Sequence, residues 1–194
     1  MSHKTNMSRW YTFFLSLTLA LIVLVAMGGV ISLKTLVLGK KEPVSRVQEQ
    51  QSAYYLVTLV EEKILYIPIE RRMSHDILGA QRLLGELLSV SFSGEDPFFS
   101  LIPPEVELRN LWVEGEVLYV DFSEDLQFNP YGSEGYAGAL HQILRTLATV
   151  SPVSSVQILI EGQTQDFLHE GVFIGEPILL QEYQEEWSSV LENR

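Results

Sequence analysis

Residues 111–123 read LWVEGEVLYVDFS, and the fold follows from this stretch and the residues around it. Two short runs of apolar and aromatic residues join at a Glu-Gly pair, which is the pattern of a β-hairpin. A helical segment containing residues 143–147 follows. Residues 153–162, VSSVQILIEG, then alternate like a half-buried strand. A hairpin, a helix and a further strand predict a compact α+β unit.

The same pattern occurs once upstream, so the chain holds two related halves. Residues 61–67, EEKILYI, align with residues 114–120, EGEVLYV, at an offset of 53. A helix with an apolar stripe at the period of about 3.6 residues follows each strand. The stripes consist of Ile77, Ala80, Leu84, Leu87 and Leu88 in the first helix, and Tyr136, Leu140, Ile143, Leu144 and Leu147 in the second. We expect one sheet with both helices packed on one face.

Three further motifs resemble the GerMN domain, a module of bacterial sporulation and spore-germination proteins. They are ILYIP at residues 64–68, LLGELL at 83–88 and SLIPP at 100–104, the last being similar to the hinge between the halves of that domain. The resemblance extends over residues 54–178. It implies a non-catalytic binding and assembly module, of the kind that builds rings in sporulation channels or accompanies cell-wall enzymes.

Five positions match turns and strand ends of the family pattern, and we take them as candidate structural positions. They are Pro103, Asp121, Ser123, Thr146 and Gly162. Asp121 is expected to accept hydrogen bonds from loop amides, and Ser123 to close the adjacent turn. We predict no catalytic, cofactor-binding or metal-binding role for any of the five.

The N-terminal part predicts a membrane anchor. After a tail at residues 1–9, residues 10–33 are 24 residues without a charge. As a helix they span about 36 Å, compared with about 30 Å of hydrocarbon in a bilayer. A cleaved signal peptide is the alternative, but its apolar core is usually only about 7–15 residues long. Residues 34–52 are then a linker, 53–180 the GerMN-like domain, and 181–194 a C-terminal amphipathic helix.

Two indications about orientation disagree. Lys4 and Arg9 precede the anchor, whereas Lys34, Lys40 and Lys41 follow it, so the positive-inside count places the domain in the cytoplasm. The GerMN resemblance implies the outer side of the cytoplasmic membrane. We expect a single-pass protein with its domain outside, although the flanking charges argue against this. The expected partners are envelope proteins or further copies of the chain, with peptidoglycan as an alternative ligand.

The composition excludes several classes of function. The formal net charge is −12, and residues 42–194 carry eight basic residues against all 25 acids. A charge of −17 on this part repels nucleic acid and anionic lipid headgroups. Cysteine is absent, which rules out disulfides, thiol nucleophiles and thiolate metal sites. The chain has no glycine-rich phosphate loop.

Carboxylates offer one catalytic alternative. Asp121, Glu124 and Asp125 lie within five residues, as a cation site or an acid–base pair would require. Their spacing does not match an EF-hand loop. The histidines, His3, His75, His141 and His169, have no metal-ligand spacing. The competing hypothesis is therefore a carboxylate-dependent cell-wall hydrolase or a peptidoglycan-binding protein.

Two apolar segments have either an internal or an external role. Phe98, Phe99, Leu101 and Ile102 follow a polar loop and pack onto the core or form an exposed binding patch. We favour the core. The C-terminal helix carries an apolar stripe at Tyr183, Trp187, Val190 and Leu191. Such a stripe docks on its own domain or enters a groove of a partner, and we favour docking.

Overall fold

The computed structural model describes residues 48–192, except residue 62 and residues 91–96. The chain divides into two compact units, Met1–Arg46 and Val47–Arg194. The predicted tail, the anchor at residues 10–33 and most of the linker at 34–52 therefore lie outside the described residues. Within the described part, no helix has the length and apolar character needed to cross a bilayer. The anchor stays a prediction.

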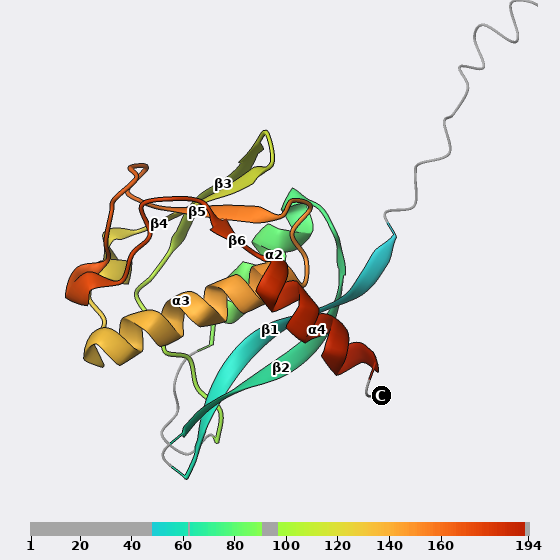
Figure 1. The fold of residues 1–194 in the computed structure, drawn as a ribbon, viewed down its shortest axis with the longest axis horizontal. Coiled ribbons are helices and arrows are strands. Elements are labelled where there is room, and N and C mark those ends of the chain that lie inside the picture. The colour runs from blue at the N-terminus through green and yellow to red at the C-terminus, as the bar shows by residue number, and fades with distance from the viewer. Residues whose placement is uncertain (1–47, 62, 91–96, 193–194) are drawn as a thin grey trace, which may run out of the picture. The chain divides into compact units, whose positions relative to one another are not determined.

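A long antiparallel hairpin and a helix form the first half (Figure 1). β1 (Glu49–Val60) pairs with β2 (Lys63–Ser74) along the full length of both strands. α2 (Ile77–Leu88) follows, and the Asp76 side chain caps it by accepting the Gly79 N–H at 2.8 Å. Because β1 begins at Glu49, the last four residues of the expected linker belong to this hairpin, where they pair with residues 71–74.

The second half repeats the hairpin and helix and then adds two strands. Its elements are β3 (Leu108–Glu114), β4 (Val117–Phe122), the 3-10 helix η1 (Glu124–Gln127), α3 (Gly132–Ala148), β5 (Ser155–Ile160), the 3-10 helix η2 (His169–Gly171), β6 (Ile178–Leu179) and α4 (Gln181–Glu192). β5 lies parallel to β4, and β6 lies antiparallel to β5. Gly115 permits the tight β3–β4 turn, since its φ is +62°.

The prediction of an α+β fold is confirmed, but the prediction of one continuous sheet is wrong. The described strands form two sheets, β1-β2 and β3-β4-β5-β6. Figure 1 shows α3 running between the four-stranded sheet and the β1–β2 hairpin. α3 packs on β1 and also contacts α2 and α4. The helix that was expected to cover one sheet therefore separates two.

The apolar stripes were predicted better for α3 than for α2. All five predicted stripe residues of α3 are buried. In α2, Gly79 and Leu83 are buried, whereas Ile77 is 39% exposed and Leu88 is only partly buried. The difference arises because α2 packs on β1, β2, β3 and α3 together. Elements on several sides of α2 bury a different face of this helix from the one that a single flat sheet would bury.

β5 is buried on both faces, although its alternating sequence predicted a half-buried strand. Gln157 and Leu159 are only 3% and 6% exposed, like their apolar neighbours. β5 lies inside its sheet, between β4 and β6. The Gln157 side chain is satisfied there, because its Nε2 donates to the Ile174 carbonyl at 2.8 Å. A parallel strand covered on both faces can carry a polar residue only with such a partner.

Parts of both segments with open roles pack against the core, and the side chains of Trp187, Val190 and Leu191 lie outside the described ones. Leu101 and Ile102 are buried, and Phe99 bridges to Val57 of β1, whereas Phe98 remains 40% exposed. At the C-terminus, Tyr183 of α4 packs against the core cluster. The first turns of α4 therefore dock on the domain that precedes them.

Candidate functional site

Asp121 and Gly162 form one internal contact at the carboxyl ends of β4 and β5. Asp121 is 6% exposed, and its Oδ1 accepts the Gly162 N–H at 2.7 Å. Gly162 has a φ of +75°, a conformation that favours glycine. The carboxylate thus holds the turn that ends β5. Asp121 has the predicted loop-bonding role and does not face open solvent.

Ser123 joins the start of β3 to the end of β4. Its Oγ accepts the Glu107 N–H at 3.0 Å and donates to Asp125 Oδ2 at 2.9 Å. Next to it, Glu161 accepts the Glu124 N–H at 3.2 Å and forms an ion pair with Arg109. Of the carboxylates considered for catalysis, Asp121 accepts a backbone amide and Asp125 accepts the Ser123 hydroxyl. Glu124 is exposed at the surface. In the described part of the chain, no cluster of metal-ligating side chains is found.

Pro103 and Thr146 lie in different settings. Pro103 is buried, and its carbonyl accepts the Val106 N–H at 3.1 Å in the predicted turn. Thr146 lies in the last turn of α3, within the predicted helical segment, and is fully buried. Its hydroxyl accepts the Tyr55 N–H of β1 at 3.2 Å.

Thr146 belongs to a polar ladder that the sequence interpretation missed. Gln142, Thr146 and Thr149 are spaced i, i+4 and i+7 on α3, and all are essentially inaccessible to solvent. Gln142 Nε2 donates to the Tyr55 carbonyl at 2.8 Å. The Thr149 hydroxyl lies 3.0 Å from both the amide nitrogen and the carbonyl oxygen of Ala53. Polar residues at helical spacing beside the apolar stripe of α3 were the available signal.

The ladder closes the outer edge of β1. The outward backbone groups of Ala53 and Tyr55 bond to α3 side chains. Those of Val57 bond to Phe99 in both directions at 2.9 Å. An open edge presents unpaired N–H and C=O groups to any passing strand. Along these residues β1 has no such groups left, so no second copy can add a strand there.

A second cluster, also missed, holds α4 against α3 and β2. The Arg145 guanidinium lies 4.3 Å from the Tyr66 ring centroid and pairs with Glu186 of α4. His141 lies 6.1 Å from the Tyr66 ring and 5.8 Å from the Tyr183 ring. Burial, aided by the Glu186 carboxylate, raises the pKa of the Tyr55 hydroxyl to about 12. Burial also lowers the pKa of His141, and Arg145 adds to this effect.

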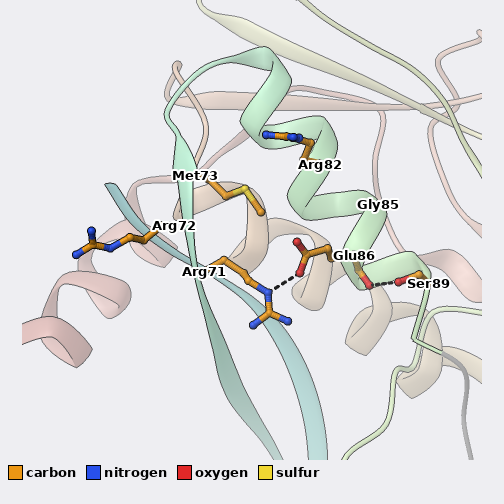
Figure 2. A pocket seen from close by; sticks show the side chains of 7 residues that line it. All are labelled: Arg71, Arg72, Met73, Arg82, Gly85, Glu86 and Ser89. Carbon is orange, nitrogen blue, oxygen red and sulfur yellow. Dashed lines mark hydrogen bonds and ion pairs between the residues drawn. The ribbon is translucent and has the colours of Figure 1, made fainter. Parts of the chain in front are cut away.

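A groove between β2 and α2 gathers three arginines in an otherwise acidic domain (Figure 2). It has a volume of about 510 Å³ and is lined by Arg71, Arg72, Met73, Arg82, Gly85, Glu86 and Ser89. Arg71 is committed to the fold, because it bonds to Glu86 at 2.6 Å, the Glu70 carbonyl at 2.8 Å and the Tyr54 hydroxyl at 3.2 Å. Figure 2 shows Arg72 extending away from α2. The arginines do not converge, so we assign no ligand to this groove.

Comparison with known proteins agrees with this fold. The model of the Germane family, described as "Sporulation and spore germination", matches residues 52–166. The chain is similar to the tandem GerMN domains of the sporulation protein GerM from Bacillus subtilis, with 17% identity and a TM-score of 0.53. That match covers 73% of this chain and 49% of the tandem structure, so the chain spans about half its length.

Two further structures share the similarity. The first GerMN domain of the same Bacillus subtilis protein matches with 16% identity and a TM-score of 0.53, covering 67% of this chain and 97% of the domain. A candidate lipoprotein from Clostridium perfringens matches with 17% identity and a TM-score of 0.49, covering 71% and 91%. Comparison with curated proteins gives no significant match.

Proposed function

The chain belongs to the Germane family of sporulation and spore-germination domains, and from this premise we propose that it is a non-catalytic, membrane-anchored module of the cell envelope. It acts by assembling with protein partners or with copies of itself. The uncharged run at residues 10–33 supports the anchor, because its length suits a bilayer span. The described domain then lies on the outer side of the cytoplasmic membrane, as the family resemblance implies.

The main observation in support of a non-catalytic role is the burial of Asp121. A catalytic carboxylate must reach a substrate, and its partner must lie in the same cleft. Asp121 is instead buried and hydrogen-bonded to the Gly162 amide. Glu124 is exposed, and its N–H donates to Glu161. The geometry therefore favours a structural role for Asp121 over the cell-wall hydrolase hypothesis.

The hydrolase hypothesis has a direct test. We expect the full-length wild type to release no soluble glycan fragments from purified peptidoglycan. Full-length chains carrying Glu124→Gln or Asp125→Asn should fold and give the same result. The Asp121→Asn chain should unfold more easily, since the Gly162 amide loses a charged acceptor. Release of soluble glycan fragments by the wild type, abolished by Glu124→Gln without loss of stability, would contradict the proposal.

The assembly role is tested in intact cells. A protease-sensitive tag after Arg194 should be cleaved from outside, whereas a tag before Met1 should be protected. Native electrophoresis of gently solubilised membranes should show the 22.0 kDa chain in a larger complex. A tag cleaved only after lysis would place the domain in the cytoplasm. A chain that migrates as a monomer in native electrophoresis, even after chemical crosslinking in the cells, would argue against assembly.

A further inference from the structure

Exposed aromatic rings gather where two loops meet. Phe128, Phe167 and Phe173 are 61%, 54% and 50% exposed. Phe167 and Phe173 are in contact, with ring centroids 5.5 Å apart. Phe128 lies 5.8 Å from the His169 ring. We call these four side chains the aromatic ridge. Single exposed apolar residues are normal, but two exposed ring pairs on neighbouring loops of a folded surface indicate an interaction site.

The loop that carries the ridge is tied to the core on both sides. Leu168 and Ile174 are buried, and each directly follows one of the exposed phenylalanines, Phe167 and Phe173. The Leu168 N–H donates to the Val172 carbonyl at 2.8 Å, and the Ile174 N–H donates to the Asp166 carbonyl at 2.9 Å. These contacts keep the two phenylalanines outside, because Leu168 and Ile174 already occupy the core.

Gln127 ties the two loops to each other. Its Oε1 accepts the His169 N–H at 2.8 Å, and its Nε2 donates to Gln165 Oε1 at 2.5 Å. Gln127 is itself 7% exposed, so both bonds are partly shielded from water. In Figure 1, the segment of η2 lies beside the N-terminal end of α3. Phe128 lies at the same end of the domain, because its ring is 5.8 Å from that of His169 in η2. A surface held in place in this way has little ordering entropy to lose on binding.

The charge around the ridge is one-sided. Residues 124–134 hold three carboxylates and residues 163–176 hold three more. Between residues 109 and 193 the Lys and Arg residues are Arg109 and Arg145, and both are paired with carboxylates, Glu161 and Glu186. A surface of this sign attracts Lys and Arg side chains and repels anionic lipid and nucleic acid.

The ring angles favour a protein partner. Phe167 and Phe173 meet at 65°, and Phe128 and His169 meet at 78°. Rings at such angles do not make the continuous flat platform on which successive bases stack. They instead leave recesses between ring edges and faces that aliphatic side chains fill.

We propose that the aromatic ridge is the docking surface for a partner-protein segment in which apolar side chains are flanked by Lys or Arg. The apolar side chains enter between the rings, and the basic groups face Asp166, Glu170 and their acidic neighbours. This proposal rests on the assembly function proposed above and names the surface and the chemistry of its partner.

Photocrosslinking in intact cells tests the ridge. The full-length chain carries p-benzoylphenylalanine in place of Phe167 or Phe173, with Leu65 and Leu78 as control positions that are also exposed and apolar, on β2 and α2. We expect both ridge positions to crosslink one protein, at a segment with Lys or Arg beside apolar residues. Adducts to glycan or lipid, or no protein adduct above the control positions, would overturn the proposal.

Charge variants and a defined peptide complete the test. Asp166→Asn with Glu170→Gln should lower the crosslinking yield about threefold, whereas Glu114→Gln with Glu116→Gln in the β3–β4 turn should not. A synthetic peptide of the crosslinked segment should bind the full chain in nanodiscs, about tenfold more weakly after Phe167→Ala with Phe173→Ala. Equal yields from the two charge pairs, or equal affinities, would refute the docking geometry.

The two proposals fail in different ways. A protein partner captured from Leu65 or Leu78 alone would refute the ridge and leave the assembly function standing. No protein partner from any of the four positions would count against both. Unchanged thermal unfolding of the ridge variants, expected because the rings are exposed, excludes misfolding as the cause of a lost adduct.

Discussion

Replacing Thr149 by valine tests whether the polar ladder of α3 stabilises the β1 edge. The two side chains are nearly the same size, so the change removes a hydroxyl without opening a cavity. That hydroxyl accepts the N–H of the fully buried Ala53, and its single proton lies within donating distance of the Ala53 carbonyl at 3.0 Å and the Thr146 carbonyl at 2.8 Å. Leaving a buried polar group unsatisfied costs about 1–3 kcal/mol. With two groups affected, we expect a loss of about 2–4 kcal/mol in the free energy of unfolding.

Urea unfolding of the full-length chain, followed by tryptophan fluorescence, measures this loss. Thr164→Val is the matched control, because Thr164 is exposed and its hydroxyl makes no hydrogen bond in the described part of the chain. The control should change stability by less than about 0.5 kcal/mol. The loss of stability in Thr146→Val should lie between those of Thr149→Val and Thr164→Val, because the Thr146 hydroxyl serves one backbone group of β1, the Tyr55 N–H. If Thr149→Val matched Thr164→Val, the ladder would not be what stabilises this edge.

Three further perturbations have defined outcomes. Gly162→Ala should lower the free energy of unfolding by about 1–2 kcal/mol, because an L-residue at a φ of +75° is strained, and Gly162→Asn should recover part of this loss in the same urea assay. Asp76→Ala should cost about 1 kcal/mol at pH 7. The Gly79 amide and the Ser74 hydroxyl hold the pKa of Asp76 below its usual value. The stabilisation by the cap is therefore full above the unfolded-state pKa and is lost as the pH falls through the lower folded-state pKa. The urea midpoints of wild type and variant should converge at that pH, and a gap that stays constant with pH would contradict the capping role. Arg145→Met should release α4, because it removes both the Glu186 ion pair and the contact with the Tyr66 ring. Limited proteolysis should then cut within residues 181–192 faster than in an Arg109→Met control. Equal cleavage rates would show that Tyr183 alone is enough to hold α4 on the domain.

Local patterns in the sequence predicted the elements that depend on neighbouring residues. The Glu-Gly pair at residues 114–115 requires a tight turn between two apolar runs, and the hairpin forms there. The stripe of α3 follows the helical period, and all five of its residues are buried. Asp121 was expected to bond a loop amide, and the Gly162 N–H is that amide. Each of these features is decided within a few residues or by one matched pair of strand ends.

The number of sheets was decided by contacts between distant residues. β1 and β3 both have sequences suited to pairing, and nothing local forbids a single sheet. The Gln142, Thr146 and Thr149 side chains bond to the edge of β1 from about 90 residues away in sequence, and this occupies the groups that another strand would need. The sequence displays those three residues at helical spacing but does not show which backbone they meet.

By itself the sequence determined the β3–β4 hairpin, the helices, the acidic net charge and the family, because periodicity, turn chemistry and net charge are local or additive properties. The tertiary structure decided which polar groups face each other. It buried Asp121 against Gly162, closed the β1 edge with α3, and left Phe167 and Phe173 outside because the residues that follow them, Leu168 and Ile174, occupy the core. Burial is a property of the whole packed chain, and no single stretch of sequence contains it.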